Sequence, residues 1–501
     1  MVSYNMNITL QTPTKAIVTT DNHEEIQKLK TQCTYVKNNI KYLISKHKQN
    51  RWWKNKDIDG WENRLEELKA DLFGSILMID ENDNFWIRPG YITHIEQIQY
   101  SIENNISYPD LKPISWLKKP DFNDYKYQTE SVKNLIKIKH GNISLPTGTG
   151  KSHILLMAAK EMGLDTVIVT PSRSIFNELL NEFQKRLGKK YVGGYGDGKK
   201  DIKKRITIAI GKSLSNLKEG TEQYEFFKNK QVMMVDESHT FAANELEKVC
   251  HGVLSNVPYR FFVSATQTRG DGTEKLLHSI IGENVLSMSL QDAIEQKYLC
   301  PLKISILEVH SPSSLKKKDP LECKRVHFLY NIEIAKIYAK IANASWHLKK
   351  QSTLILVEEL RQIKMLSELL TVPFAYVHSA SKKDAGKWGL ETVKLQEQVD
   401  KFNKGEVIVL IGTSCISTGT NTYPTHNTMN WVGGSSEIKT KQGTMGRSTR
   451  KLEISKYSDL HSPKLFSRIY DIRVLNQPIL ENQLKKRIEF YQECGENVSY
   501  F

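Results

Sequence analysis

The stretch from Leu145 to Ser152, which reads Leu-Pro-Thr-Gly-Thr-Gly-Lys-Ser, constrains this chain more than any other feature. A short apolar run ending at Ser144 precedes it, and an apolar, helix-like segment from Ile154 to Ala159 follows it. A glycine-rich turn between a strand and a helix is the context in which Gly-Lys-Ser forms a phosphate-binding loop. The two glycines let backbone N–H groups point at an anion, and the helix adds the positive end of its dipole. The alternative is an ordinary glycine-rich turn.

This loop assigns roles to particular side chains. We expect Lys151 to reach the β- and γ-phosphates of a nucleotide and the Ser152 hydroxyl to ligate Mg²⁺. The sequence therefore predicts ATP and Mg²⁺ as cofactors. The residues expected to bind them in this loop are Leu145, Pro146, Thr147, Gly148, Thr149, Gly150, Lys151 and Ser152.

Two adjacent carboxylates form the second motif. The apolar run 232–235 ends in Asp236 and Glu237, and Ser238 and His239 follow. A carboxylate at the carboxyl end of a strand can hold Mg²⁺, so Asp236 is the second expected metal ligand. Glu237 points another way and can polarise the water that attacks the γ-phosphate. Adjacent acids alone are a weak signal, but beside the predicted phosphate loop they become a strong one.

Composition limits the class of protein. A chain of 501 residues is too long for one core, and two to four domains are expected. Lys and Arg number 71 against 56 Asp and Glu, so the net charge of 71 − 56 = +15 suggests a polyanionic partner, with solubility charge as the alternative. The six cysteines form no Cys-x-x-Cys pair, which argues against a zinc ribbon. Without an apolar run approaching 18 residues or a signal-peptide pattern, we expect a cytoplasmic protein without a membrane partner. The sequence leaves the oligomeric state open, with a monomer favoured.

Short β-branched runs alternate with helical stretches through most of the chain, which predicts parallel, helix-covered sheets. We expect an α/β fold with two such lobes, preceded by a small α+β domain. The predicted domains are 1–110, 111–300 and 301–501. The predicted strands are 143–144, 166–169, 206–210, 232–235 and 261–264 in the first lobe, and 303–307, 352–357, 374–377, 407–411, 428–431 and 468–472 in the second.

The first 110 residues mix strand and helix patterns. The alternation over 8–19 predicts one strand, and Asp21 is the expected cap of a helix through Gln32. Residues 35–44 fit a strand or a helix. Two strands are predicted at 76–80 and 84–87, followed by a helix from Pro89 to Tyr100.

A basic segment from Lys46 to Lys56 lies inside this region. Its cations flank two tryptophans, a composition suited to phosphate contacts and base stacking. The nucleic-acid contacts expected here are Lys48, Arg51, Trp52 and Trp53. The alternative is a solvated charged loop whose tryptophans pack back on the domain.

Together these motifs resemble the superfamily 2 helicases. Lys151-Ser152 matches the family's first motif, and Asp236 to His239 matches its Asp-Glu-x-His motif. Leu145 stands where the full phosphate-loop pattern has glycine, a departure that is normal in this family. Ser264-Ala265-Thr266 is similar to the third motif. The Arg-Gly-Asp-Gly that follows at 269–272 is similar to an extension of the XPB-like and phage UvsW-like branch.

The resemblance implies further site residues in the first lobe. An upstream glutamine in the family reads adenine, which here is Gln128 after Tyr127. Arg173 and Lys212 follow strands at the places where the family grips the nucleic-acid backbone. The coupling between nucleotide and nucleic acid is assigned to His239, Ser264 and Thr266.

The second lobe carries the remaining motifs. The stretch from Thr413 to Asn421 is similar to motif V; the resemblance assigns Thr413 to nucleic acid and Gly419 and Asn421 to the cofactor. Gln442 to Arg450 is similar to motif VI, but three residues separate Gln442 from Gly446-Arg447, where the family has two. Arg447 and Arg450 would share one face of a helix and act as arginine fingers.

The resemblance implies an ATP hydrolase coupled to DNA translocation and unwinding, with branched or forked DNA as partner in replication, recombination or repair. An RNA helicase and a duplex-DNA translocase subunit of a restriction-type system are the alternatives within the motor class. From a different class, the chain could be a nucleic-acid binder that uses ATP only as a switch. Intact Lys151, Glu237 and Arg450 argue against that.

Overall fold

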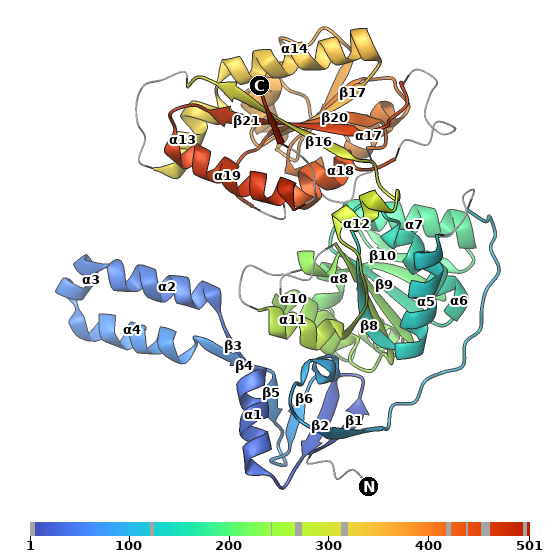
Figure 1. Ribbon diagram of the computed structural model, residues 1–501. Helices are drawn as coiled ribbons and strands as arrows, with labels where there is room; N and C mark the ends of the chain where they lie inside the picture. Colours follow the sequence, from blue (N-terminus) through green and yellow to red (C-terminus); the bar gives the residue numbers. More distant parts are fainter. Residues whose placement is uncertain are drawn as a thin grey trace. The chain divides into compact units, whose positions relative to one another are not determined.

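The computed structural model describes residues 6–120, 125–241, 243–265, 273–311, 319–416, 422–436, 439–451, 461–493 and 498–501. The chain divides into two compact units. The first unit holds Met1–Leu145 and Gly150–Ser287, and the second holds Pro146–Thr149 and Met288–Phe501 (Figure 1). None of the described helices is long and apolar enough to cross a membrane.

An eight-stranded sheet forms the centre of the first unit, in the order β11-β10-β12-β9-β13-β14-β8-β15. Every pairing in it is parallel except that of β11 with β10. Figure 1 shows α5 and α6 on one face and α10 and α11 on the other. The strands are β8 (His140–Ser144), β9 (Thr166–Thr170), β10 (Val192–Gly196), β11 (Lys199–Lys200), β12 (Ile206–Ile210), β13 (Val232–Asp236), β14 (Tyr259–Ser264) and β15 (Glu283–Ser287).

The helices around this sheet are α5 (Lys126–Ile138), α6 (Lys151–Met162), α7 (Arg173–Leu187), α8 (Gly211–Ser215), α9 (Glu222–Lys228), α10 (Ala243–Glu247) and α11 (Glu274–Ile281). The five strands predicted for this lobe are all present. The strands β10, β11 and β15 were not predicted. The sequence of β10, Val-Gly-Gly-Tyr-Gly, has little intrinsic strand preference, and β15 lies at the sheet edge with exposed polar residues.

The second unit holds a seven-stranded sheet in the order β18-β19-β17-β20-β21-β16-β22, with every described pairing parallel. Its six predicted strands are confirmed, whereas β22 was not predicted. The strands are β16 (Leu302–Val309), β17 (Ser352–Val357), β18 (Phe374–Val377), β19 (Val409–Gly412), β20 (Thr425–Trp431), β21 (Ser467–Val474) and β22 (Val498–Tyr500). The helices are α12 (Leu290–Glu295), α13 (Pro320–Lys324), α14 (Ile332–Lys349), α15 (Leu360–Ser367), α16 (Lys382–Gly386), α17 (Leu395–Asn403), α18 (Gly446–Ser448) and α19 (Pro478–Gln492).

The N-terminal part of the first unit is a small mixed sheet in the order β5-β6-β2-β1-β7, with α1 (His23–Cys33) beside it. Both strands predicted at 76–80 and 84–87 are present. The sheet strands are β1 (Met6–Thr12), β2 (Lys15–Thr19), β5 (Leu77–Ile79), β6 (Phe85–Ile87) and β7 (Tyr100–Asn104), and a separate ribbon pairs β3 (Thr34–Val36) with β4 (Phe73–Ser75).

Three predictions for this region were wrong. The predicted strand 8–19 is a hairpin, because the chain turns between Thr12 and Lys15 and pairs β1 with β2. The cap of α1 is Asn22, not Asp21, since the Asn22 side chain accepts from the N–H groups of Glu24 and Glu25. The helix predicted from Pro89 to Tyr100 is only the 3₁₀ turn Pro89–His94, and β7 then begins at Tyr100. Residues 35–44 contain both predicted alternatives, the end of β3 and the start of α2.

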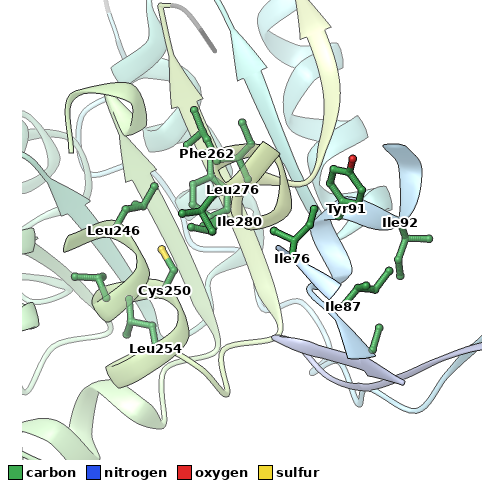
Figure 2. Close-up of a cluster of buried hydrophobic side chains, with 14 of the residues drawn as sticks. Ile76, Ile87, Tyr91, Ile92, Leu246, Cys250, Leu254, Phe262, Leu276 and Ile280 are labelled. Carbon is green, nitrogen blue, oxygen red and sulfur yellow. The ribbon is translucent and has the colours of Figure 1, made fainter. Parts of the chain in front are cut away.

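The small sheet and the large sheet share one hydrophobic core. Figure 2 shows Ile87, Tyr91 and Ile92 of the N-terminal part near Leu276 and Ile280 of α11. Polar contacts join the same parts: buried Arg88 pairs with Glu247, and the Lys275 ammonium donates to the carbonyl oxygens of Gln32 (2.6 Å) and Thr34 (2.9 Å). A Cβ on Gly90 would lie 2.5 Å from the Ser279 carbonyl oxygen, so only glycine permits this approach.

Between β3 and β4 the chain forms a helical arm, defined here as residues 37–72. It contains α2 (Asn38–Gln49), α3 (Arg51–Lys56) and α4 (Ile58–Ala70), and it joins the rest of the unit through the β3–β4 ribbon (Figure 1). His47 of α2 stacks on Trp61 of α4, with ring centroids 4.9 Å apart. The two residues also bond each other's backbone: His47 Nε2 lies 2.8 Å from the Trp61 oxygen, and Trp61 Nε1 donates to the His47 oxygen at 3.1 Å. These contacts fix α2 against α4.

Candidate nucleotide-binding site

The phosphate loop lies where the sequence predicts it, between β8 and α6. Gly148 and Gly150 have φ of 94° and 88°, in the left-handed region that favours glycine. A Cβ on Gly150 would lie 2.4 Å from the Gln128 Nε2, so glycine there also admits the side chain of Gln128. Within the loop, the Thr149 hydroxyl donates to the Pro146 oxygen at 2.7 Å. These features give the turn its form.

Lys151 is buried and held by two oxygens. Its ammonium donates to the Leu145 carbonyl at 3.2 Å and lies 3.2 Å from a Glu237 carboxylate oxygen. The loop lysine and the catalytic carboxylate predicted from sequence are therefore in direct contact. A phosphate group at the loop would compete with Glu237 for the same ammonium.

Asp236 ends β13 as a buried carboxylate. Burial, together with the charge of Glu237, raises the pKa of Asp236 to about 7, although Lys151 acts in the opposite direction. Glu237 follows with φ of 48° and ψ of 46°, a left-handed conformation that is rare for a residue with a side chain and is typical of functional sites. Two acids thus lie side by side with one nearby lysine.

This donor set fits Mg²⁺. A cation beside Asp236 would supply the positive charge that keeps a buried carboxylate ionised. Ser152, the other expected ligand, is an exposed residue in the first turn of α6. The described residues contain no cluster of three His, Cys, Asp or Glu side chains suited to a metal ion. Mg²⁺ is commonly held by one or two carboxylates and by phosphate oxygens, so such a cluster is not required.

A continuous polar network leaves this site. His239 Nδ1 lies 3.5 Å from the second Glu237 oxygen and 2.6 Å from the Ser264 hydroxyl. The Ser264 carbonyl in turn accepts from the N–H of Leu145 at 2.9 Å, which begins the phosphate loop. Two of the three predicted coupling residues therefore meet, and the third, Thr266, lies outside the described residues. Lys151, Glu237, His239 and Ser264 are called the Lys151–Ser264 network below.

Gln128 is buried at the start of α5. Its side-chain oxygen accepts from the Tyr125 N–H at 3.0 Å, which caps the helix, and its amide nitrogen lies 3.4 Å from the Tyr127 hydroxyl. The cap fixes the amide next to Gly150. Adenine recognition by Gln128 stays a prediction.

Comparison with known proteins supports this interpretation. Residues 121–269 match the family described as "Type III restriction enzyme, res subunit". The chain is 27% identical over 303 residues to the DNA 3'-5' translocase XPB2 of Sulfurisphaera tokodaii, a match covering 57% of this chain and 64% of the relative. These matches support a superfamily 2 helicase similar to the XPB-like proteins.

Solved structures of low sequence identity were also compared. The fold is similar to a fragment of a putative HsdR subunit of a type I restriction enzyme from Vibrio vulnificus YJ016, with a TM-score of 0.52 and 16% identity over 75% of this chain and 68% of that one. Together with the two sheets, this likeness confirms the predicted pair of RecA-like lobes. The structure of T4 UvsW aligns over 99% of both chains, with 14% identity and a TM-score of 0.43.

Two predicted nucleic-acid residues share one edge of the large sheet. Arg173 begins α7 after β9, and Lys212 lies in α8 after β12; these strands are neighbours, with Thr170 opposite Ile210. Both side chains are exposed, and Arg173 lies 3.5 Å from Asp197. Two solvent-facing cations at the carboxyl edge suit phosphate contacts.

In the second unit, Thr413 follows β19 and is buried, with its hydroxyl 3.4 Å from the Cys415 sulfur. Gly419 and Asn421, the predicted cofactor contacts, lie outside the described residues. Arg447 is buried on α18.

The prediction that Arg447 and Arg450 share a helix face was wrong, because α18 ends at Ser448 and Arg450 lies beyond it. The stretch Lys439–Met445 before α18 is a π-helix. A π-helical turn takes up one residue more than an α-helical turn, which accounts for the extra residue after Gln442.

The sequence did not single out Lys464, which holds the backbone from Ser448 to Arg450 in place. Its ammonium donates to the carbonyl oxygens of Ser448 and Arg450, both at 2.7 Å. Burial lowers the pKa of Lys464 to about 8. A lysine without a neighbouring motif gives no sequence signal for such a role. The Arg450 guanidinium carbon lies 5.7 Å from the ring centroid of Tyr423.

The basic segment Lys46–Lys56 is helical, formed by the end of α2 and all of α3. Trp53 is half-buried and packs edge-on against His47 at 4.9 Å, as the alternative of tryptophans packing back on the domain predicts. Lys48 is exposed. The side chains of Arg51 and Trp52 lie outside what the structure describes.

Proposed function

We propose that this protein hydrolyses ATP and uses the energy to translocate along DNA. The observation that carries the proposal is the Lys151–Ser264 network, which links the phosphate loop, the predicted catalytic carboxylate and the third helicase motif. Bound Mg²⁺–ATP would supply the phosphoryl group and the charge that neutralises Asp236. Lys151, Ser152 and Asp236 would hold it.

The network also supplies a route for coupling. Glu237 accepts a proton from the attacking water, and its carboxylate then loses charge. His239 touches both Glu237 and Ser264, so that change alters the hydrogen bond to Ser264. Ser264 is the last residue of β14, and its carbonyl accepts a hydrogen bond from Leu145 at the start of the phosphate loop. A change at the nucleotide can therefore reach the backbone at this edge of the sheet.

Glu237→Gln is expected to lower the turnover number at least ~100-fold, because the amide cannot accept the proton from water. ATP and Mg²⁺ binding should be retained, since Lys151 and Asp236 are unchanged. Phosphate release and equilibrium nucleotide binding measure the two effects separately. Turnover within a few-fold of the unchanged protein would contradict the role of Glu237 as the base.

Asp236→Asn is expected to stabilise the protein without metal and nucleotide. The folded-state pKa is about 7, whereas the ordinary value is 3.8, so the unfolded chain releases its proton first as pH rises. Folding stability is therefore lost between about pH 4 and pH 7. The mutant should melt at a higher temperature than the unchanged protein, and by more at pH 8 than at pH 5. Asp201→Asn, an exposed aspartate, is the control and should show no such difference.

We further propose that the DNA is branched or forked and that the helical arm contacts it. Residues 37–56 contain seven Lys or Arg and no Asp or Glu, whereas residues 57–71 contain six Asp or Glu and two Lys or Arg. One side of the arm is thus positive and the other negative. On α2, exposed Lys41, Lys46 and Lys48 flank Tyr42, which is 65% exposed. Phosphates would contact the α2 side.

Replacing the arm by a turn tests this proposal. Val36 pairs with Phe73, so Asn-Gly in place of residues 37–72 closes β3 and β4 as a hairpin and leaves the shared core intact. Fork binding should weaken, and its salt dependence should become shallower by about 0.9 in log–log slope for each phosphate that the protein no longer binds. Single-strand-stimulated ATPase should be retained. Lys41→Ala with Lys46→Ala and Lys48→Ala should give part of the same loss, whereas Arg64→Ala on α4 should not. Equal fork binding across a salt titration would rule the arm out.

The choice of nucleic acid is tested by the ATPase rate with single-stranded DNA, forked DNA, blunt duplex and RNA at one salt concentration. Strongest stimulation by forked DNA supports the proposal. Stimulation by RNA alone or by blunt duplex alone would favour an RNA helicase or a duplex translocase. No stimulation by any of them would contradict a motor.

A further inference from the structure

Three consecutive backbone carbonyls, those of Ser448, Thr449 and Arg450, are held by groups from elsewhere in the second unit. The Lys464 ammonium donates to the Ser448 and Arg450 oxygens, both at 2.7 Å. The N–H of Cys300 donates to the Thr449 oxygen at 2.6 Å. Carbonyls at the end of a helix have no partner within the helix, so donors from outside fix the path of the chain there. These contacts of Lys464 and Cys300 are called the carbonyl clamp below.

The carbonyl clamp is anchored in the sheet of the second unit. Cys300 lies two residues before β16, and Lys464 lies three residues before β21. These strands are parallel neighbours, and the Ser467 N–H donates to the Pro301 oxygen at 2.8 Å. The Cys300 thiol also lies 3.8 Å from the Lys464 carbonyl oxygen. Residues 448–450 are therefore held by the segments that enter two adjacent strands, and not by α18 alone.

Apolar packing fixes the other end of α18. Met445, the last residue of the π-helix before α18, is buried in a core to which Leu290 and Ile294 of α12 also belong. The segment that contains α12 and Cys300 thus contacts the chain on both sides of α18. The core fixes the start of this short helix, and the carbonyl clamp fixes its end.

The side chain of Arg450 keeps a donor that the structure does not use. Its Nε is buried and has no hydrogen-bond partner among the described residues. Its guanidinium carbon lies 5.7 Å from the ring centroid of Tyr423. A buried donor without a partner costs free energy, so an acceptor such as a phosphate oxygen is its expected partner. A fixed backbone with an available guanidinium suits a group that must be in place before it acts.

Lys464 occupies an unfavourable place for a cation. Burial lowers its pKa to about 8, and the charge of Arg450 acts in the same direction, whereas the Cys300 thiol acts in the opposite one. Burying one cation near another costs folding free energy, which a neutral side chain at this position would avoid. Stability alone therefore does not account for a lysine here. Its two bonds beside Arg450 point to a positioning role.

We propose that Lys464 is a positioning residue for Arg450: it holds the backbone of residues 448–450 so that the guanidinium is in place when the phosphoryl group is transferred. The inference rests on the proposed function, because it needs ATP as the substrate and Arg450 as the group that acts on it. Lys464 acts only through Arg450.

Lys464→Met is expected to lower the turnover number of the full-length protein ~100-fold, the scale for a reacting group displaced by about 1 Å, with nucleotide affinity within about twofold. Lys464→Arg keeps a cation with several donors and should stay within ~10-fold of the unchanged protein. Lys485→Met, which removes an exposed lysine from α19, is the matched control and should hydrolyse ATP normally. Phosphate release with single-stranded DNA and equilibrium nucleotide binding give the two quantities.

A double-mutant cycle separates positioning from stability. Because Lys464 acts through Arg450, Lys464→Met should change turnover by less than about twofold in a protein that already carries Arg450→Ala. A general loss of stability would lower turnover by the same factor in both backgrounds. If Lys464→Met melts below the assay temperature, Lys464→Gln takes its place in the cycle, since it keeps an N–H donor and loses the charge.

Amide hydrogen exchange gives a readout that does not depend on turnover. The Cys300 N–H should exchange faster in Lys464→Met than in Lys485→Met, because the carbonyl that it bonds is no longer held on both sides. Full turnover in Lys464→Met, or the full loss in the Arg450→Ala background, would overturn the inference and leave the proposed function standing. No phosphate release from the unchanged protein with any nucleic acid would overturn both.

Discussion

Lys151→Ala is expected to abolish ATP hydrolysis, with no measurable nucleic-acid-stimulated phosphate release. The Lys151 ammonium is the cation predicted to contact the β- and γ-phosphates, and it contacts the Glu237 carboxylate and the Leu145 carbonyl in this structure. Its removal leaves the Asp236–Glu237 pair without the lysine that opposes the raised pKa of Asp236. Both nucleotide affinity and the chemical step should therefore be lost.

Nucleic-acid binding separates this effect from misfolding. The helical arm, Arg173 and Lys212 are unchanged in Lys151→Ala, so fork affinity should stay within about twofold of the unchanged protein. Lys133→Ala, which removes an exposed lysine from α5, should hydrolyse ATP normally. Near-normal turnover in Lys151→Ala would contradict the assignment of the loop, whatever the binding result.

The sequence was sufficient for the parts of the site that depend on local spacing. The loop from Leu145 to Ser152 and the pair Asp236–Glu237 each lie at a strand end, and strands made of β-branched runs are recognisable in sequence. The strands β8, β13 and β14 end at the same edge of the sheet. Lys151 therefore contacts Glu237, and His239 contacts Ser264. The order of the motifs made these contacts predictable, but not the distances between the atoms.

Other features could not be predicted because they arise from long-range packing. The core shared by the N-terminal sheet and α11 joins apolar residues far apart in the chain, none of which forms a distinctive local pattern. The segment Lys46–Lys56 looks like a charged loop until His47 and Trp61 pair α2 with α4. Cys300 and Lys464 reach the carbonyls of residues 448–450 only when β16 and β21 lie side by side.

Motif VI shows how the backbone can absorb a departure from a family pattern. The extra residue after Gln442 falls in the π-helix Lys439–Met445, so α18 begins directly afterwards at Gly446 and carries the buried Arg447. The Ser448 hydroxyl then donates to Thr428 of β20 at 2.6 Å, which anchors α18 to the sheet. Arg450 leaves the helix two residues later, with its carbonyl held by Lys464. The two arginines therefore have different surroundings, and we expect them to differ in function.

Arg450→Ala is expected to lower the turnover number by ~10³ or more with little change in nucleotide affinity, as for an arginine finger that acts mainly in the transition state. Arg447→Ala should lose activity through a different route: because Arg447 is buried, its removal should also lower the melting temperature, which Arg450→Ala should not. Steady-state ATPase, nucleotide binding and thermal melting distinguish the two. Arg473→Ala, which breaks a pair with Glu308 at the protein surface, is the arginine control and should keep full turnover. An isolated first unit with full activity, or unchanged turnover in Arg450→Ala, would show that the second unit supplies no group to the reaction.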